Sequence, residues 1–347
     1  MLAFGGAASG GGAANGGAAN GGAANGGAAS GGGASNGGAS NGGAAKGGAS
    51  NGGASNGGAS NGGASNGGAA NGGAAKGGTA NGGNVSNNGG STPTRLPTAK
   101  QACPQLKTGM VSFLGSQVSL SIGPANTKGP VLFYWHATGT TYTEVQSGFG
   151  DVIQDVKANG GVVASFTTTT SSGTNTGNGV WYTGDLEVAD EVLACAIEQG
   201  LVDTRRIHVS GCSAGGLQCA AMSYLRSGYV ASVLCMSGGF VSRVSSYELQ
   251  DAVHVPSAIA AHGAAGSDVF ILDFATCSAA YCSSLVSKGG LAINCDDGGD
   301  HIASMASRAR TMGPVAWRFF AENPYAAGNR YTSGLPSYFP SYCAIAR

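Results

Sequence analysis

The first 90 residues consist of short repeats such as Asn-Gly-Gly-Ala-Ser, and this tract limits which part of the chain can fold. It holds more than half of the 65 glycines and almost no large apolar side chains. Burial of such side chains must offset a backbone ordering cost of about 1–2 kcal/mol per residue, so the tract cannot form a core. Glycine-rich chain of this kind behaves as a flexible tether. We therefore predict a disordered tether over residues 1–96 and one folded domain over residues 97–347.

Charge and hydropathy exclude several classes of partner. The chain has 17 basic and 17 acidic residues, and only Lys46 and Lys76 are charged within the tract. Because nucleic acids and anionic membranes bind clustered basic residues, we expect neither as a partner. No apolar run reaches the roughly 18 residues of a transmembrane helix, and no signal peptide is visible at the N-terminus. The oligomeric state stays open.

Cysteine usage indicates an oxidising compartment. The nine cysteines all lie in the predicted domain, at positions 103, 195, 212, 219, 235, 277, 282, 295 and 343. Their spacing matches no zinc site, so we expect no metal and predict disulfides in an extracellular or surface-tethered protein. Cys277 and Cys282 could close a small loop, and Cys103 with Cys343 could join the domain ends. An odd count leaves at least one thiol free, and the alternative is that several cysteines are small buried residues.

Beyond the tract, apolar runs typical of buried strands alternate with segments of helical periodicity. We predict strands over residues 118–122, 131–135, 162–166, 207–210, 230–236, 257–261 and 291–294, and helices over residues 144–158, 185–199 and 214–226. A last helix begins at Ile302, and we expect Pro314 to interrupt it. Strands alternating with helices indicate an α/β fold with a mostly parallel sheet covered on both faces.

The segment Gly-Cys-Ser-Ala-Gly-Gly at residues 211–216 contains a G-x-S-x-G motif. A predicted strand precedes it and a predicted helix follows, which is the setting in which this motif presents a nucleophilic serine on a tight turn. Ser213 is therefore the candidate nucleophile. The alternative is an ordinary Gly/Ser turn in a chain rich in both residues.

A serine hydroxyl needs a histidine as its base and a carboxylate to orient that histidine. His301 follows the last predicted strand in a glycine-containing loop, and Asp268 follows the strand before it, which matches the chain order serine, acid, histidine. Other candidates remain on both sides. They are Asp273, Asp296, Asp297 and Asp300 for the acid, and His136, His208, His254 and His262 for the base, although His208 lies within a strand and is more typical of a core.

The reaction also needs hydrogen-bond donors for the developing oxyanion. One expected donor is the backbone N–H of Ala214, directly after the nucleophile. The other should come from the loop after the strand at residues 131–135, where we select Thr138.

Taken together, these motifs resemble the polyhydroxybutyrate depolymerase and feruloyl or acetylxylan esterase group of α/β-hydrolases. The resemblance rests on Val-Leu-Phe-Tyr-Trp-His at 131–136, Trp181, residues 202–216, His262-Gly263 with Asp268, and Asp300-His301 with Trp-Arg-Phe-Phe at 317–320. It implies an α/β-hydrolase fold and hydrolysis of esters through an acyl-enzyme, with no metal or organic cofactor. The implied substrate is a polyester or an acylated plant polysaccharide, including insoluble polymers.

The chain departs from that group at two places. His136-Ala137 replaces the usual His-Gly, and residues 167–179 form an unusual loop rich in Thr, Ser, Gly and Asn. Tannase-type feruloyl esterases pair a cysteine beside the serine with one next to the histidine. Here Ile302 follows His301, so Cys295 could be the partner of Cys212 instead.

We assign His136, Trp181 and Tyr182 to substrate binding, the last two as stacking platforms for a sugar or aromatic group. Ordinary partial burial is the alternative for both aromatic residues. Two other functions compete with the esterase: a serine peptidase on the same fold, and a surface-tethered binding protein without turnover.

Overall fold

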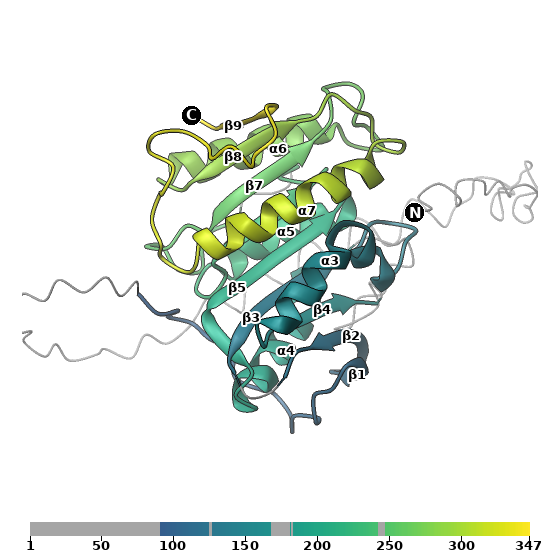
Figure 1. The fold of residues 1–347 in the computed structure, drawn as a ribbon, viewed down its shortest axis with the longest axis vertical. Helices are drawn as coiled ribbons and strands as arrows, with labels where there is room; N and C mark the ends of the chain where they lie inside the picture. Colours follow the sequence, from purple (N-terminus) through teal and green to yellow (C-terminus); the bar gives the residue numbers. More distant parts are fainter. Residues whose placement is uncertain (1–90, 125–126, 168–180, 182, 242–246) are drawn as a thin grey trace, which may run out of the picture. The chain divides into compact units, whose positions relative to one another are not determined.

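The computed structural model describes residues 91–124, 127–167, 181, 183–241 and 247–347 (Figure 1). The predicted tether falls almost entirely outside the described residues, and so does Tyr182. The architecture below is that of the described part of the predicted domain.

A mixed sheet forms the centre of the domain. Its strands are β1 (Gly109–Phe113), β2 (Ser116–Ile122), β3 (Gly129–Trp135), β4 (Val162–Phe166), β5 (Val202–Cys212), β6 (Ser232–Met236), β7 (Ser257–His262), β8 (Ala292–Asp296) and β9 (Cys343–Ile345). Their order is β1-β2-β4-β3-β5-β6-β7-β8-β9. The six strands from β4 to β8 in this order run parallel, whereas β1, β2 and β9 pair antiparallel at the two edges.

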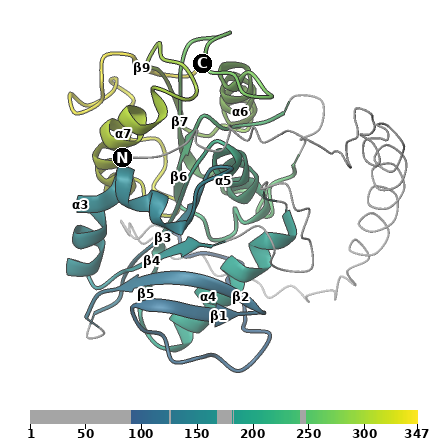
Figure 2. The same ribbon diagram turned by 90° about the vertical axis from the view of Figure 1, so that its right-hand side faces the viewer.

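Helices cover both faces of the sheet, as Figures 1 and 2 show. They are α3 (Val145–Ala158), α4 (Leu186–Glu198), α5 (Ala214–Leu225), α6 (Phe274–Ser287) and α7 (Met305–Glu322), with short 3-10 turns η3 (Tyr142–Glu144) and η5 (Thr183–Asp185). Helices α3 and α7 lie together on one face, and α4, α5 and α6 lie on the other. Two apolar cores result, one on each side of the sheet. Strand β3 is buried along its whole length because both of its faces are covered.

Most predicted elements are confirmed, although three elements were not predicted and some boundaries differ. The sequence reasoning did not include β1, β9 and the full α6, and it placed the start of β5 five residues too late. The predicted interruption at Pro314 is wrong, because α7 continues through this residue. Proline removes one helical hydrogen bond, but the buried side chains of Val315, Ala316 and Phe319 beyond it still pack against the sheet and hold the last turns.

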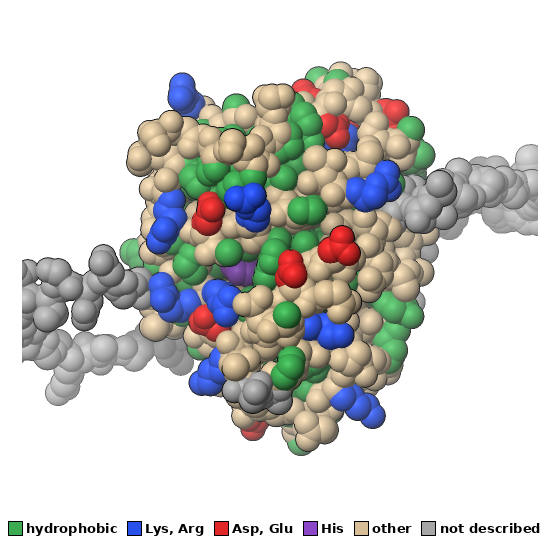
Figure 3. Space-filling view, viewed as in Figure 1, with side chains coloured by type: hydrophobic (Ala, Val, Ile, Leu, Met, Phe, Trp, Pro, Cys, Tyr) green, Lys and Arg blue, Asp and Glu red, His purple; other side chains and the backbone are tan. Residues whose placement is uncertain are grey.

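Charged side chains of both signs are mixed on one side of the molecule. On the side seen in Figure 3, basic and acidic side chains are interspersed, and neither sign covers a large continuous area. Among the described residues, no helix combines the length and the apolar character needed to cross a bilayer.

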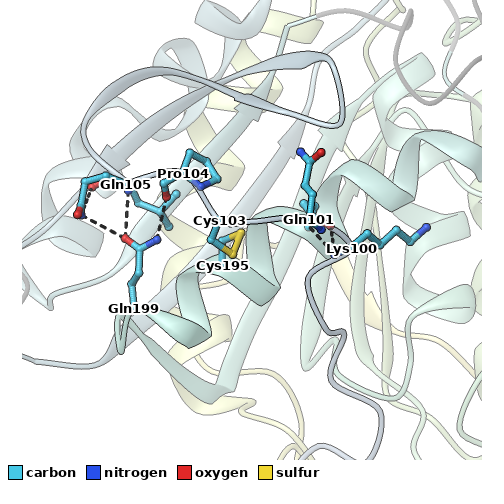
Figure 4. Close-up of a disulfide and its surroundings, with 9 residues drawn as sticks. Lys100, Gln101, Cys103, Pro104, Gln105, Cys195 and Gln199 are labelled. Carbon is cyan, nitrogen blue, oxygen red and sulfur yellow. Dashed lines mark hydrogen bonds between the residues drawn. A yellow bond between two sulfur atoms is a disulfide. The ribbon is translucent and has the colours of Figure 1, made fainter.

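Three disulfides connect the domain: Cys103–Cys195, Cys219–Cys235 and Cys295–Cys343. The first fastens the segment at the start of the domain to α4 (Figure 4). Beside it, the Gln199 side chain donates to the Pro104 carbonyl at 2.8 Å and accepts from the Leu106 N–H at 3.1 Å. The beginning of the domain is therefore held by both a covalent bond and hydrogen bonds.

The predicted cysteine pairs are all wrong, and each error has a geometric reason. Cys277 and Cys282 stand five residues apart on α6, so their side chains point in different directions around the helix. Cys343 lies on β9 directly opposite Cys295 of β8, which removes both from the other proposed pairs. Cys212 ends β5, three strands away from β8, a separation of about 14 Å that no disulfide spans. Cys212, Cys277 and Cys282 are free and buried.

Candidate active site

Ser213 stands on a sharp turn between β5 and α5. Its φ and ψ angles are 56° and −117°, a conformation that L-residues rarely adopt. Glycines make the turn possible, because a Cβ on Gly211 would collide with the Gly215 carbonyl and a Cβ on Gly215 would collide with the Trp135 carbonyl. Such strain persists where the surrounding structure imposes it, and it is frequent at functional sites. The turn projects the serine hydroxyl from the carboxyl end of the central strand.

The structure brings Ser213, His301 and Asp268 into one chain of hydrogen bonds. The Oγ atom of Ser213 lies 3.0 Å from Nε2 of His301, and Nδ1 of the same ring lies 2.7 Å from Oδ1 of Asp268. All three side chains are buried. With Nδ1 protonated toward the carboxylate, Nε2 is left as an acceptor for the serine proton.

The Asp268 carboxylate is fully buried, and its surroundings favour the charged form. Its Oδ2 atom accepts hydrogen bonds from the Gly263 N–H at 2.8 Å and from the Ser237 hydroxyl at 2.9 Å. Burial alone raises the pKa of Asp268, but the hydrogen bonds from His301, Gly263 and Ser237 and the charge of Arg308 outweigh it and hold the pKa below its ordinary value.

Arg308 on α7 joins the acid to the loop that carries the histidine. Its Nη1 atom lies 3.4 Å from Oδ2 of Asp268 and donates to the Ser237 hydroxyl at 2.8 Å. Its Nε and Nη2 atoms form a two-point contact with the Asp297 carboxylate at 2.9 and 2.8 Å. The side chain is only 1% exposed. Asp297, one of the alternative acids, is thus the partner of Arg308.

Aromatic rings and exposed apolar side chains surround His301. The Phe274 ring stacks on the imidazole with centroids 4.6 Å apart, and the Phe270 ring lies parallel to it at 5.9 Å. Four neighbouring apolar side chains face solvent, and we call them the apolar rim. The apolar rim consists of Val269 (42% exposed), Phe270 (59%), Ile271 (84%) and Ile302 (48%).

The loop after β3 lies beside the nucleophile, as the oxyanion prediction requires. A Cβ on Gly215 would meet the carbonyl oxygens of both Trp135 and His136, so the end of β3 packs directly on the start of α5. The Ala137 N–H is engaged by the Glu144 carboxylate. Donation by Ala214 and Thr138 to an oxyanion stays a prediction.

The predicted substrate-binding residues are more buried than expected. The Trp181 side chain is 9% exposed, packs edge-on against Trp135 and His136, and donates its indole N–H to the His136 carbonyl at 2.8 Å. His136 is 6% exposed, and burial lowers the pKa of its ring. The structure favours the packing alternative for Trp181, and substrate contact by His136 stays a prediction.

The alternative histidines bond to groups other than Ser213. His208 contacts the Ser232 hydroxyl at 2.9 Å and stacks on Phe320, and burial lowers its pKa to about 3. His254 and His262 contact the Val230 carbonyl and the Asn294 amide oxygen, both at 2.9 Å. His208 is therefore the core residue that its strand position predicted.

One cluster in the described part of the chain has metal-like spacing. It consists of Cys103, Cys195 and Glu198. Its two sulfur atoms form a disulfide, and metal binding requires the thiolate. We assign no metal site to it.

Sequence reasoning missed Arg308 and Glu144, although both break an apolar helical pattern. Arg308 lies at helical spacing among the buried residues Met305 and Met312 of α7. Glu144 precedes the buried positions Gly148 and Val152 at the same spacing. A charged residue on the core face of a helix is the signal that could have found them.

Comparisons with known proteins give similarity of structure alone. No protein-family model matches the chain, and no curated protein matches it. The solved structure of native pOPH is similar with a TM-score of 0.51 and 16% identity, covering 71% of this chain and 97% of that chain. Native sOPH gives a TM-score of 0.51 and 13% identity, over 71% of this chain and 96% of that chain. A bacterial heroin esterase has a TM-score of 0.44 and 17% identity, over 63% of this chain and 84% of that chain.

The fold follows from the topology together with the similarity to the two OPH structures. The mostly parallel sheet and the sharp turn between β5 and α5 are the arrangement expected from the sequence, and the antiparallel pairing of β2 is an addition to it. The described domain of this chain has the α/β-hydrolase fold.

Proposed function

We propose that this protein is a serine carboxylic ester hydrolase that acts through an acyl-enzyme, with Ser213 as nucleophile, His301 as base and Asp268 as the acid that orients it. The observation that carries the proposal is the continuous hydrogen-bonded chain from Ser213 to Asp268, built on the strained turn after β5. Buried groups in this arrangement are suited to activating a hydroxyl that is otherwise a weak nucleophile.

In the acylation step, the Ser213 oxygen attacks the ester carbonyl carbon while Nε2 of His301 takes the hydroxyl proton. Asp268 stabilises the imidazolium through the Nδ1–H bond. The carbonyl oxygen becomes an oxyanion, for which the N–H groups of Ala214 and Thr138 are the assigned donors. His301 then gives its proton to the leaving alcohol, and the acyl group stays on Ser213.

In the deacylation step, water replaces the alcohol. His301 takes a proton from water as the water oxygen attacks the acyl carbon, and it returns that proton to Ser213 when the carboxylic acid leaves. The residues present can carry both steps without another reactive group.

The apolar rim favours a polyester over an acylated polysaccharide as substrate. Its exposed side chains flank Asp268 and His301 in the sequence, and the Phe270 ring lies against the imidazole. Exposed apolar patches of this kind mark binding sites. A polysaccharide surface is polar, whereas three of the four side chains of the rim are aliphatic and Trp181 is nearly buried. We therefore propose an apolar, ester-linked polymer that rests on the rim.

We also propose an extracellular location, with residues 1–96 as the tether of an enzyme that works on an insoluble material. Three disulfides support this proposal, because such bonds persist mainly in oxidising compartments.

The test measures initial hydrolysis of short-chain nitrophenyl esters by the full chain and by Ser213→Ala. Loss of all activity in the variant is expected. If both hydrolyse the esters equally, Ser213 is not the nucleophile; if both are inert, a binding protein replaces the esterase.

The substrate class is tested with polyhydroxybutyrate film and acetylated xylan. Phe270→Ser with Ile271→Ser should reduce release of acid from the film at least tenfold and leave the nitrophenyl esters little changed. Val253→Ser is the matched control, since this side chain is 90% exposed and precedes β7 at the opposite end of the sheet. Faster action on xylan than on film would contradict the polyester proposal.

A further inference from the structure

Glu144 is a buried carboxylate at the end of η3 that lies outside the three residues assigned to acid–base chemistry. Its side chain is almost fully enclosed, with 2% of the residue exposed. Its Oε1 atom accepts from the Tyr134 hydroxyl at 2.8 Å, and its Oε2 atom contacts the Thr140 hydroxyl at 2.7 Å. Both oxygens lie 3.2 Å from the Ala137 N–H. One carboxylate thus binds the strand β3 and two positions of the loop that follows it.

This loop is the one that the proposed mechanism uses. It begins where the His136 carbonyl packs on the first turn of α5, next to Ser213. With the Ala137 N–H held by Glu144, that amide is not available to an oxyanion. The direction of the next amide, that of Thr138, is fixed once Ala137 and Thr140 are held on either side of it. Glu144 therefore constrains the orientation of the loop through Ala137 and Thr140.

We propose that Glu144 is a positioning residue that holds the loop at residues 136–140 in the conformation in which its backbone can donate to the oxyanion. The inference rests on the proposed ester hydrolysis and deepens it. Glu144 does not touch the reacting atoms, and it acts through Ala137 and Thr140.

Several groups in and around this site have shifted pKa values. Among them, Glu144 is the group that changes charge near neutral pH. Burial raises its pKa to about 7, although hydrogen bonds from Thr140, Tyr134 and Ala137 oppose the rise. Burial also raises the pKa of Tyr134 from β3 and of Cys212 from β5 well above their ordinary values, so both stay neutral.

Two more distant charges, those of Arg308 and Asp268, also act through space on this part of the domain. The Cys212 thiol interacts with Glu144 and also with Arg308 of α7 and with Asp268. At the end of β3, burial lowers the pKa of the His136 ring, so that ring is neutral at pH 7. The nearest described groups are therefore uncharged around Glu144 near neutrality.

Both protonation states of Glu144 can be satisfied, but not equally well. In the ionised state, the hydroxyl of Thr140 donates to Oε2. In the protonated state, Oε2–H can donate to the Thr140 oxygen, whose own hydrogen then goes to the Ala137 carbonyl at 2.8 Å. Hydrogen bonds to a charged acceptor are roughly twice as strong as neutral ones. The individual hydrogen bonds from the loop to Glu144 are thus stronger above pH 7, although burial of the charge makes the ionised state less favourable for the fold as a whole.

The experiment compares the full chain with Glu144→Gln, Glu144→Ala and Ser213→Ala, using kcat and KM for a soluble nitrophenyl ester from pH 5.5 to 9. Glu144→Ala should lose at least about tenfold in kcat with KM changed less than twofold, because one lost oxyanion donor costs about 10²–10³ and a loosened one costs less. Glu144→Gln keeps the hydrogen bonds but cannot ionise. At pH 6, this variant should keep most of the wild-type kcat. Its plot of kcat against pH should show one ionisation fewer near pH 7 than the plot for the wild type.

Glu191→Ala on α4 is the matched control. This carboxylate is equally buried and accepts from the N–H groups of Lys100 and Gln101, far from the loop. Its removal should lower the unfolding temperature without changing kcat in the folded protein.

The outcomes separate the two proposals. If Ser213→Ala keeps full activity, the proposed function fails and the role of Glu144 fails with it. If Ser213→Ala is inactive, the inference alone is overturned when folded Glu144→Ala keeps its kcat, or when Glu144→Gln retains the wild-type pH profile. The Gln variant decides the matter if the Ala variant does not fold.

Discussion

Replacement of Arg308 by methionine tests whether this buried arginine does more than hold the fold together. The variant keeps most of the side-chain volume but leaves Asp268 and Asp297 without their shared cation. At the observed 3.4 Å between Nη1 and Asp268, an effective dielectric constant of about 20 gives an attraction of about 5 kcal/mol. Breaking a buried ion pair from one side usually costs about 3–5 kcal/mol. For a domain of this size, that corresponds to a fall in Tm of about 6–20 °C.

The catalytic effect of Arg308→Met should be separate from its effect on stability. Asp268 keeps its bonds from Gly263 and Ser237, so the acid stays near its place. Without the nearby cation, the Asp268–His301 pair binds a proton more readily. The acid limb of kcat/KM against pH should therefore move to higher pH. Arg308→Lys keeps the charge but not the two-point contact, so it should restore the pH profile more than the Tm.

The assay combines thermal unfolding with the pH dependence of ester hydrolysis. Arg226→Met is the matched control, because Arg226 binds Asp190 at 2.6 Å with a side chain 19% exposed and lies at the far end of α5. It should lower the Tm and leave the pH profile unchanged. If Arg308→Met also lowers the Tm but keeps the wild-type pH profile, Arg308 has a purely structural role and the reasoning is refuted.

Three further predictions concern the turn, Glu144 and the cysteines. Gly215→Ala should lower kcat at least about 100-fold, because the new Cβ collides with the Trp135 carbonyl and displaces Ser213. Gly150→Ala is the control, since a Cβ there meets no atom within 4 Å, and it should leave kcat unchanged. Since the folded pKa of Glu144 is raised from 4.5 to about 7, its contribution to stability is fully present below pH 4.5 and is lost as the pH rises through 7. In urea unfolding, the free energy of unfolding of Glu144→Gln relative to the wild type should therefore rise by up to about 3 kcal/mol between pH 4 and pH 8. If this difference in unfolding free energy is the same at both pH values, the pKa of Glu144 is not raised. Burial raises the pKa of the thiols of Cys212, Cys277 and Cys282. Ellman's reagent should therefore react with no thiol in the native protein and with three thiols after unfolding. A larger number of reactive thiols after unfolding would contradict the disulfide pairing.

The parts of the site that depend on local sequence could be predicted. The turn at Ser213 needs a strand before it, a helix after it and glycines at fixed positions, and all three features lie within about a dozen residues. Chain order then placed Asp268 and His301 after successive strands, and parallel strands bring such positions to one edge of the sheet. The structure places these residues together, while their catalytic roles stay predictions.

The parts that depend on strand order could not be predicted from the same patterns. Cys343 pairs with Cys295 because β9 turns back along β8, and three residues are too few to show a strand periodicity. Pro314 was misjudged for a related reason, since the rule for proline describes a single helix and not the packing of Phe319 and Phe320 on the sheet. In each case a tertiary contact decided the outcome.

Glu144 and Arg308 show how the two loops of the site depend on one helical layer. Glu144 holds the loop before α3, and Arg308 on α7 holds the loop that carries His301. The two helices pack against each other at Gly148 and Gly313, where a Cβ on Gly313 would collide with the Gly148 carbonyl. Since this close contact holds α3 against α7, it also constrains the distance between the loop at residues 136–140 and the loop that carries His301. The spacing of the groups around Ser213 is thus set partly by glycine packing on the face of the sheet opposite α5.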